Sequence, residues 1–270
     1  MTQKEQQFVK TVWEFYERHG RHSLPWRSTK NPYKILVSEL MLQQTQVDRV
    51  IPKYVNFMKR FPTARKLAAA PLGEVLEYWQ GLGYNRRAKF LWLAAKEIET
   101  TYNNRFPKSE KELLQLPGIG PYTASAILTF AYNQPVTLIE TNVRTVYIHH
   151  FFKSQNKVSD TELLPLITRT TSAERSAEWY AAVMDYGTYL KKEFGNNISQ
   201  SAQYKKQSTF KGSDREVRGA IIKLLLNQNH TDTALKKELP FSSEKIKTQL
   251  IILEKEGLIA KEKNIYSVPK

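Results

Sequence analysis

Residues 116–128 read Leu-Pro-Gly-Ile-Gly-Pro-Tyr-Thr-Ala-Ser-Ala-Ile-Leu, and this stretch decides how the middle of the chain folds. Two glycines, Gly118 and Gly120, separate an amphipathic helix from a second helix that begins at Pro121. Glycine permits a tight turn and a close approach of the backbone to a ligand, and the amides at the start of the second helix favour an anion. The stretch therefore predicts a helix-hairpin-helix motif that holds a phosphate. An ordinary helical hairpin with glycines at its bend is the alternative.

The charge of the chain agrees with an anionic partner. The 270 residues carry a formal net charge of +15, and residues 201–270 hold 14 Lys and Arg against 8 Asp and Glu. Because both regions of the chain are basic, both can face a polyanion such as DNA. Solubility or an acidic protein partner would give the same balance, so the charge alone only favours nucleic acid.

The sequence contains no cysteine. This excludes disulfides, thiolate zinc sites and cysteine-ligated iron–sulfur clusters. There is no apolar run of 18 or more residues, and the first 20 residues have the pattern of an amphipathic helix rather than of a signal peptide. We therefore expect a soluble cytoplasmic protein, associated with the nucleoid and not with a membrane.

Helical periodicity dominates to about residue 190, which predicts a mainly α fold. The expected helix signals are a capping box at Ser109 and Glu112, a start at Asn31-Pro32 with an end near Gln44, a start at Pro71 with an end before Gly81, and a cap at Ser159 with Glu162.

Beyond residue 190 the pattern changes. The segment Lys191–Ser213 loses its apolar periodicity and gathers Asn, Gln, Ser and Gly, which predicts a linker and a domain boundary near Gly212. Three helices are expected at 214–227, 232–239 and 242–256, followed by strands at 258–259 and 265–268. This order is typical of a winged helix in which 242–256 is the recognition-type helix. A small packing or dimerisation domain of the same topology is the alternative.

One carboxylate lies inside a strongly apolar helical run. Glu39 stands in the middle of Leu-Val-Ser-Glu-Leu-Met-Leu, residues 36–42. Burial raises the pKa of a carboxyl, so that a proton stays available near neutral pH for general acid catalysis. A solvated glutamate on a helix surface is the alternative.

A second carboxylate, Glu140, comes just before an expected helix start at Thr141. The helix dipole there favours the ionised form. Two carboxylates in opposed environments suit the cleavage of a glycosidic bond, because one protonates the leaving group and the other stabilises the positive charge on the sugar. Glu39 and Glu140 are therefore predicted to act as a pair.

An ordered series of motifs gives the chain a family resemblance. The motifs are Leu24-Pro25-Trp26-Arg27, Asn31-Pro32-Tyr33, the run 38–47 that contains Gln43-Gln44-Thr45, Gly81-Leu82-Gly83-Tyr84, and the hairpin at 116–124. Across residues 8–190 the chain resembles the helix-hairpin-helix superfamily of base-excision DNA glycosylases, which includes endonuclease III. It is most similar to the adenine glycosylase (MutY-type) branch.

The resemblance implies two helical subdomains with a base pocket between them. We expect a glycosylase domain at 1–205, whose middle subdomain covers about 30–132 and whose other subdomain joins 1–29 to 133–205. Residues 206–212 are then a linker, and residues 213–270 form the winged-helix-like domain that contacts DNA.

The resemblance also implies roles for single residues. Glu39 protonates a flipped-out adenine and then helps water to complete the hydrolysis, and Glu140, together with Asn142, stabilises the sugar cation. The other implied site residues are Trp26, Arg27 and Asp185 at the base pocket; Gln43, Gln44 and Tyr84 at the gap left by the extruded base and at the opposite nucleotide; and Leu116, Gly118, Ile119 and Gly120 on the DNA backbone, where the loop can also hold a monovalent cation. A core aromatic at a helix end is the alternative for Tyr84.

Tyr122 stands where the endonuclease III branch has a lysine that forms a Schiff base with the sugar. Because a tyrosine cannot form this bond, the resemblance implies a monofunctional glycosylase without strong lyase activity.

The chain departs from the family pattern in three places. Glu140 replaces the aspartate of the adenine branch, and no glycine follows it. The segment Lys191–Ser213 takes the place of four cysteines that bind an iron–sulfur cluster in relatives, so packing must replace the cluster. The last domain is too short to be the nudix-like fold that recognises 8-oxoguanine.

The predicted function is hydrolysis of adenine from a mismatch with guanine or 8-oxoguanine in double-stranded DNA, by a monomer without a catalytic metal or cofactor. His149 and His150 are adjacent on a helix and point in different directions, so we expect aromatic packing there rather than a metal site. Two alternatives remain open: a mismatch thymine or uracil glycosylase, and a non-catalytic DNA-binding regulator on the same scaffold.

Overall fold

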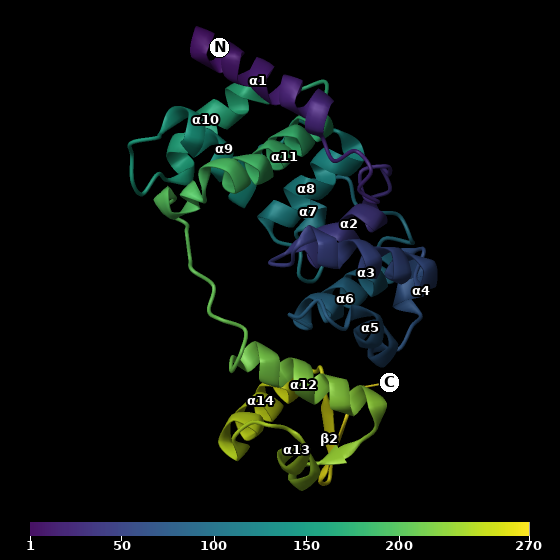
Figure 1. Cartoon of the computed structure of the whole chain (residues 1–270). Helices are drawn as coiled ribbons and strands as arrows, with labels where there is room; N and C mark the ends of the chain where they lie inside the picture. The colour runs from purple at the N-terminus through teal and green to yellow at the C-terminus, as the bar shows by residue number, and fades with distance from the viewer. Residues whose placement is uncertain (270) are drawn as a thin grey trace. The chain divides into compact units, whose positions relative to one another are not determined.

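The structure of the protein is a computed structural model that describes residues 1–269. The chain is mainly helical, as predicted, and divides into two compact units (Figure 1). The first unit contains residues 1–35, 108–114 and 119–206, and the second contains residues 36–107, 115–118 and 207–269. The predicted middle subdomain ran to residue 132. The division differs from this because the helix after the hairpin packs against helices of the first unit.

The first unit is built around the helix α11. Its elements are α1 (Gln3–His19), α7 (Glu110–Leu113), α8 (Pro121–Tyr132), α9 (Thr141–Phe151), α10 (Asp160–Thr170), α11 (Ser176–Phe194) and the 3₁₀ helix η1 (Asn197–Gln200). Helix α11 packs against α1, α8 and α9 (Figure 1). The core between them is rich in aromatic rings, and the Phe8 ring lies edge-on to Trp179 with 6.0 Å between centroids. Such aromatic packing stabilises the unit through a large buried area.

Local sequence signals set the helix ends in this unit. Ser159 and Glu162 form the predicted capping box of α10, and Pro121 occupies the first turn of α8. At α7 the prediction is only partly correct. Ser109 accepts the Glu112 amide, but the Glu112 carboxylate binds the Ser109 hydroxyl at 2.6 Å in place of the backbone amide that a capping box requires.

The segment predicted as a linker from Lys191 is ordered over its first half. Lys191 belongs to the end of α11, and η1 lies against the loop between α9 and α10. The side-chain amide of Asn197 donates to the Thr145 carbonyl at 3.2 Å, and the Val158 amide donates to the Gln200 carbonyl at 2.8 Å. Hydrogen bonds that single-sequence periodicity does not register therefore fix this segment, and the irregular stretch begins only after it.

The second unit begins within α2 (Pro32–Leu42) and continues through four further helices. They are α3 (Val47–Arg60), α4 (Ala64–Ala68), α5 (Leu72–Trp79) and α6 (Arg86–Thr100). Helices α4 and α5 both pack against α6, and α3 packs against α5. The fully buried Phe57, Phe61 and Trp79 fill the space between these helices.

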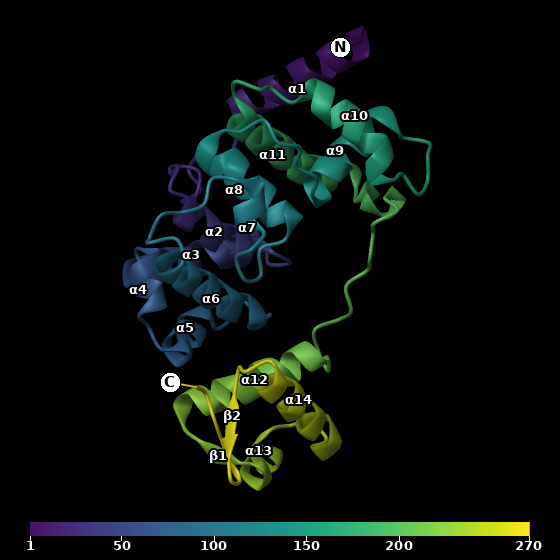
Figure 2. The ribbon, with the colours of Figure 1, turned by 180° about the vertical axis from the view of Figure 1, so that it is seen from behind.

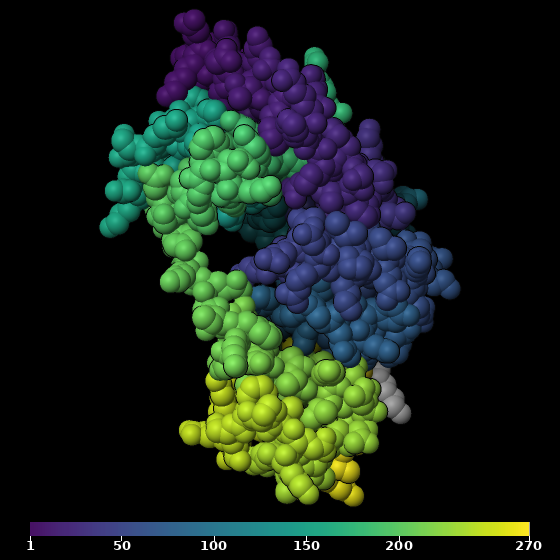
Figure 3. Space-filling model, viewed as in Figure 1, coloured from purple at the N-terminus to yellow at the C-terminus, as the bar shows by residue number. Residues whose placement is uncertain are grey.

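The C-terminal part of the second unit has three helices and a small sheet. These are α12 (Asp214–Asn227), β1 (His230–Thr231), α13 (Asp232–Glu238), α14 (Ser243–Lys255), β2 (Ala260–Glu262) and β3 (Ile265–Ser267). The sheet is antiparallel with the order β1-β3-β2 (Figure 2). In Figure 3 the side chains of this part, coloured from light green to yellow, form one closely packed body. Helix α12 also packs against α5.

The predicted helices of this part are confirmed, but its strands are shifted. Leu258 and Ile259 were expected to form a strand, whereas β2 begins at Ala260. Both side chains are almost completely buried in the core, so their apolar character reflects packing rather than pairing. The two-residue strand β1 gave no signal in the sequence because it is too short for an alternating pattern.

No helix within residues 1–269 combines the length and the apolar character needed to cross a bilayer.

Candidate active site and nucleic-acid interface

Glu39 lies on α2 and is only 8% exposed. Its helix begins where the Asn31 side chain accepts the amides of Tyr33 and Lys34, which confirms the predicted start. The neighbours Leu40 and Met41 are fully buried. The structure therefore buries this carboxyl almost completely, as the sequence predicted.

Arg87 holds the C-terminal end of α2. This side chain is 8% exposed and donates to the carbonyl oxygens of Leu40 at 2.6 Å and Gln43 at 2.5 Å. It also donates to the carbonyl oxygens of Leu82 and Gly83, both at 3.1 Å. Burial lowers the pKa of Arg87 to about 10, so the group remains charged at neutral pH. Sequence reasoning missed Arg87, because the pair Arg86-Arg87 gives no sign of which arginine is buried.

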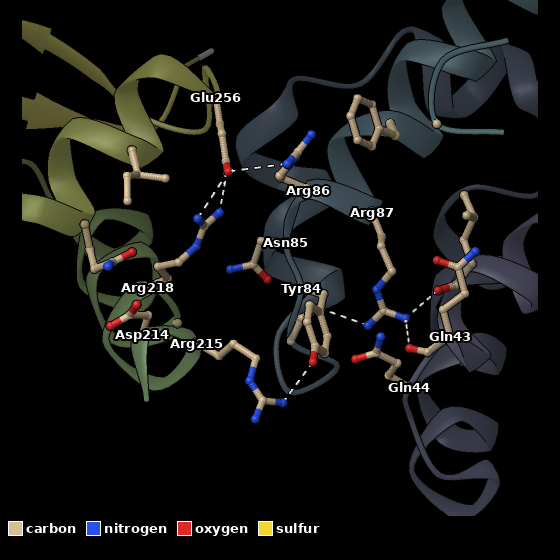
Figure 4. Close-up of a pocket in the computed structure, with 17 residues that line it drawn as sticks. Gln43, Gln44, Tyr84, Asn85, Arg86, Arg87, Asp214, Arg215, Arg218 and Glu256 are labelled. Atoms are coloured by element: carbon tan, nitrogen blue, oxygen red, sulfur yellow. Dashed lines mark hydrogen bonds and ion pairs between the residues drawn. The ribbon is translucent and has the colours of Figure 1, made fainter. Parts of the chain in front are cut away.

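Gln44 and Tyr84 lie on the two loops that Arg87 joins. Both have left-handed backbones, with φ of 55° at Gln44 and 47° at Tyr84. The helix ends at Leu42, slightly before the predicted end near Gln44, because the left-handed backbone of Gln44 cannot continue it. A positive φ on a residue other than glycine stores strain, and such strain is often found at functional positions. The structure thus brings Gln44 and Tyr84 together with Arg87 (Figure 4).

Glu140 caps the start of α9 in the first unit. Its Oε1 accepts the backbone amides of Asn142 at 2.7 Å and Val143 at 2.9 Å. Its other oxygen accepts from the Asn142 side chain at 3.2 Å, and the Asn142 side-chain oxygen in turn accepts from Lys191 at 2.8 Å. Lys191, which sequence reasoning assigned only to the linker, therefore belongs to this cluster.

The pKa of Glu140 shifts in the direction opposite to the prediction. Burial raises the pKa of Glu140, and the two backbone amides together with the charges of Lys191 and Arg144 only partly offset this. The amides at the helix start do lower the pKa, as expected. The net shift is nevertheless upward, because the prediction left out the larger cost of desolvation.

A close approach of α9 and α11 positions this cluster. A Cβ atom added to Gly187 would lie 2.7 Å from the carbonyl oxygen of Asn142. Only glycine fits at this position, so the sequence Asp185-Tyr186-Gly187 brings α11 directly against the start of α9.

Asp185 is engaged by two arginines of the first unit. Arg21 Nε donates to its Oδ1 at 2.8 Å, and Arg27 donates to the same oxygen at 3.0 Å. Arg27 also donates to the Tyr16 hydroxyl. Arg27 and Asp185, which were both predicted to line the base pocket, thus form an ion pair with each other. Their contact with a base stays a prediction, and so does the contact of the buried Trp26.

We expect Asp185→Asn to lower the free energy of unfolding by about 3 kcal/mol, because it leaves two arginines facing a neutral side chain inside the protein. Denaturant unfolding at neutral pH measures this loss. Asp160→Asn is the matched control. It also breaks a two-bond arginine pair, with Arg144, but at a more exposed site, so its cost should be below about 1 kcal/mol. Equal losses in the two variants would contradict the prediction.

The hairpin has the predicted backbone. Gly118 has a φ of 75°, and a Cβ atom there would lie 2.4 Å from Phe90. Gly120 has an ordinary extended backbone, and no other described atom lies within 4 Å of the place where its Cβ would be. The start of α8 is therefore open to a closely approaching ligand. Leu116 and Ile119 anchor the loop with buried side chains, and the cation that their carbonyls could hold stays a prediction.

The remaining predicted residues separate into the two units. The second unit contains Glu39, Gln43, Gln44, Tyr84, Leu116 and Gly118. The first unit contains Trp26, Arg27, Ile119, Gly120, Tyr122, Glu140, Asn142 and Asp185. Tyr122 packs against the aromatic core of the first unit.

The histidine pair is part of that core. The His150 ring lies 5.0 Å from the Phe8 ring and bonds to the Tyr186 hydroxyl at 3.1 Å, and burial lowers its pKa to about 4. Aromatic packing is therefore confirmed for His150.

Among residues 1–269 no group of three or more His, Cys, Asp or Glu side chains could hold a metal. With no cysteine, the chain also does not fit the iron–sulfur cluster of the resembling family.

Comparison with known proteins finds a matching family model and curated relatives. Residues 37–165 match the family described as HhH-GPD superfamily base excision DNA repair protein, and this match contains Glu39, the hairpin and Glu140. An adenine DNA glycosylase of Buchnera aphidicola subsp. Baizongia pistaciae is 39% identical over 184 residues, which are 68% of this chain and 52% of that protein. An adenine DNA glycosylase of Mycolicibacterium smegmatis is 35% identical over 224 residues, covering 77% of this chain and 76% of that protein.

The fold has solved relatives as well. The structure of a thermostable thymine-DNA glycosylase aligns with a TM-score of 0.61 and 25% identity, covering 68% of this chain and 86% of that chain. The match to the first of the curated relatives spans about half of that protein's length.

Proposed function

Because the chain belongs to the adenine glycosylase branch of the HhH-GPD superfamily of base excision DNA repair proteins, we propose that it is a monofunctional DNA N-glycosylase that hydrolyses adenine from a mismatch. Its partner is double-stranded DNA with adenine opposite guanine or 8-oxoguanine, and it acts in the cytoplasm as a monomer. The placement of Glu39 supports this most strongly, since it is a nearly buried carboxyl on a helix whose end is fixed by Arg87.

The two carboxylates divide the reaction between them. Glu39 transfers its proton to a ring nitrogen of the flipped adenine, so that the base leaves as a neutral molecule when its bond to the sugar breaks. The ionised Glu140 stabilises the positive charge that develops on the sugar. Glu39, now a carboxylate, takes a proton from the water that attacks the sugar. The products are free adenine and an abasic site.

The test is a panel of duplexes with adenine, thymine, uracil or a damaged base opposite guanine, and with adenine opposite 8-oxoguanine. We expect base release from adenine in both mismatches and none from thymine or uracil. Preferential release of thymine or uracil would instead support the alternative that the similarity to a thymine-DNA glycosylase suggests. The sequence Gln43-Gln44-Thr45 and the names of the curated relatives favour adenine.

Because residue 122 is a tyrosine and not a lysine, we predict hydrolysis without a covalent intermediate. Borohydride trapping on mismatch DNA should give no efficient adduct. The amine of Lys89 binds the carbonyl of Glu256 at the end of α14, which gives it a structural partner. If an adduct forms, Lys89→Met and Lys191→Met variants identify the amine, and the monofunctional assignment is wrong.

The pH profile of base release should depend on Lys191. Activity requires an ionised Glu140, so the rate falls as the pH is lowered through the pKa of this group, which burial raises. The charge of Lys191 lowers that pKa. In Lys191→Met we therefore expect the acidic limb of the single-turnover profile to move to higher pH, while Lys191→Arg keeps it in place. An unchanged limb in Lys191→Met would show that Glu140 does not control it.

A further inference from the structure

The second unit contains a cavity of about 580 Å³ beside the hairpin glycine Gly118. This volume lies within the range of about 300 to 1,000 Å³ that is usual for small-ligand sites. The apolar and aromatic part of its wall comes from Leu40, Phe90, Tyr84 and Ile252, and the polar part includes Gln44, Arg215 and Arg218. Figure 4 shows that α12 and α14 form one side of this cavity, and the loops with Gln44 and Tyr84 form the other.

Arg215, in the first turn of α12, contacts Tyr84 in two ways. Its Nη1 donates to the Tyr84 hydroxyl at 2.9 Å, and its guanidinium carbon lies 5.4 Å from the centroid of the Tyr84 ring. Gln207 donates to the same hydroxyl at 2.6 Å and to the side-chain oxygen of Gln44 at 3.2 Å. Residues that follow the glycosylase region are thus bonded directly to both left-handed residues of the site.

The charge of Arg215 differs from that of its neighbours. Arg86 and Arg218 both pair with the Glu256 carboxylate. Arg215 donates instead to neutral oxygens, which are the Tyr84 hydroxyl, the backbone and hydroxyl oxygens of Ser208 and the Thr209 carbonyl. These contacts hold the guanidinium at the cavity without cancelling its charge, so it can still bind acceptor atoms of a ligand.

We propose that Arg215 is a specificity-determining residue that recognises a guanine opposite the excised adenine, in the cavity that it forms with Tyr84 and Gln44. This inference rests on the proposed function, since it requires that the hairpin at Gly118 holds DNA. An aromatic ring and an uncompensated guanidinium together provide stacking and hydrogen bonding for a nucleobase. Arginine favours guanine among the bases, because its two parallel donors match O6 and N7.

The test measures single-turnover release of adenine by the full chain from duplexes with guanine, cytosine or 7-deazaguanine opposite the adenine. 7-Deazaguanine lacks the N7 acceptor. We expect Arg215→Ala to lose roughly 5- to 150-fold of the preference for guanine over cytosine, which is the usual range for a two-bond contact between arginine and guanine. Replacing guanine by 7-deazaguanine should slow the wild type but leave Arg215→Ala unaffected.

Two further variants separate recognition from charge and from structure. Lys223→Ala removes one positive charge from an exposed position of the same helix, outside the cavity, and should keep the full preference for guanine. Arg215→Lys keeps the charge and a hydrogen-bond donor for Tyr84 but not the forked pair of donors. It should therefore bind DNA with the affinity of the wild type but lack the preference for guanine. A preference fully restored by lysine would show that Arg215 only supports Tyr84.

The outcomes distinguish failure of this inference from failure of the proposed function. If the wild type releases no adenine from any duplex, the proposed function is wrong and the inference with it. If it releases adenine with a guanine preference that Arg215→Ala retains, only the inference is overturned. The same holds if the wild type shows no preference, or if Arg215→Ala binds DNA more tightly, since the contact with Tyr84 would then obstruct DNA.

Discussion

Replacing Glu39 by glutamine should slow the release of adenine by about 10²- to 10⁴-fold, the usual contribution of a general acid. The amide has nearly the shape of the carboxyl but cannot transfer a proton to the base. Because glutamine has the same size as glutamate and keeps one oxygen, the change should leave the fold intact. Single-turnover kinetics with adenine opposite guanine measures the rate, and equilibrium binding of the same duplex measures the affinity.

We expect Glu39→Gln to release adenine much more slowly while binding the duplex with the affinity of the wild type. Glu77→Gln, at an exposed position on α5, is the matched control and should behave as the wild type. Full activity of Glu39→Gln would exclude this residue as the acid. Base release that is undetectable in the wild type as well would favour a DNA-binding regulator on the glycosylase scaffold.

Glu140→Gln is the companion variant. It removes the negative charge that is assigned to the sugar cation while keeping an oxygen for the amides of Asn142 and Val143. Loss of one preorganised electrostatic contact costs about 10²-fold in rate. If this variant kept full activity while Glu39→Gln lost it, the role of Glu140 would be confined to capping α9.

Replacing Arg87 by methionine should lower the free energy of unfolding by about 3 kcal/mol or more. Methionine fills much of the same volume but donates no hydrogen bond. The carbonyl oxygens of Leu40 and Met41 would lose this donor, and each buried group left unpaired costs about 1–3 kcal/mol. The carbonyl oxygens of Gln43, Leu82 and Gly83 keep other donors in Thr45 and Trp79. Denaturant unfolding followed by circular dichroism measures the loss.

The neighbouring arginine supplies the control. The side chain of Arg86 is 56% exposed and pairs only loosely with Glu256, so Arg86→Met should change the stability by less than about 0.5 kcal/mol. Arg87→Met should also weaken DNA binding, because the loops that carry Gln44 and Tyr84 lose their common anchor. A variant with wild-type stability would show that water replaces the guanidinium.

Local features of this fold could be predicted from the sequence. The starts of α12 and α14 follow from Ser213 and Ser242, whose hydroxyls cap the helices, and the glycine turn at the hairpin follows from Gly118. Each of these signals acts within four residues of its effect. Periodicity and capping rules describe that range well.

The features that could not be predicted are contacts between distant segments. Arg21 reaches Asp185 across 164 residues, and Arg215 reaches Tyr84 across 131. The left-handed backbone of Gln44 could not be predicted, because no glycine marks this position. The raised pKa of Glu140 results from burial by elements that lie elsewhere in the chain. The burial of Glu39 could be predicted from its apolar neighbours in sequence, but not the arginine that fixes the end of its helix.

The packing of α12 against α5 makes deletion a poor way to study the C-terminal residues. A chain that stops before Ser208 would uncover the face of α5 that α12 covers and would leave Lys89 without the carbonyl it binds. Newly uncovered apolar surface promotes aggregation, so a truncated enzyme could lose activity through insolubility rather than through lost recognition. Single substitutions on the cavity side of α12 keep this surface covered. They are therefore the better way to measure what the C-terminal part of the second unit contributes.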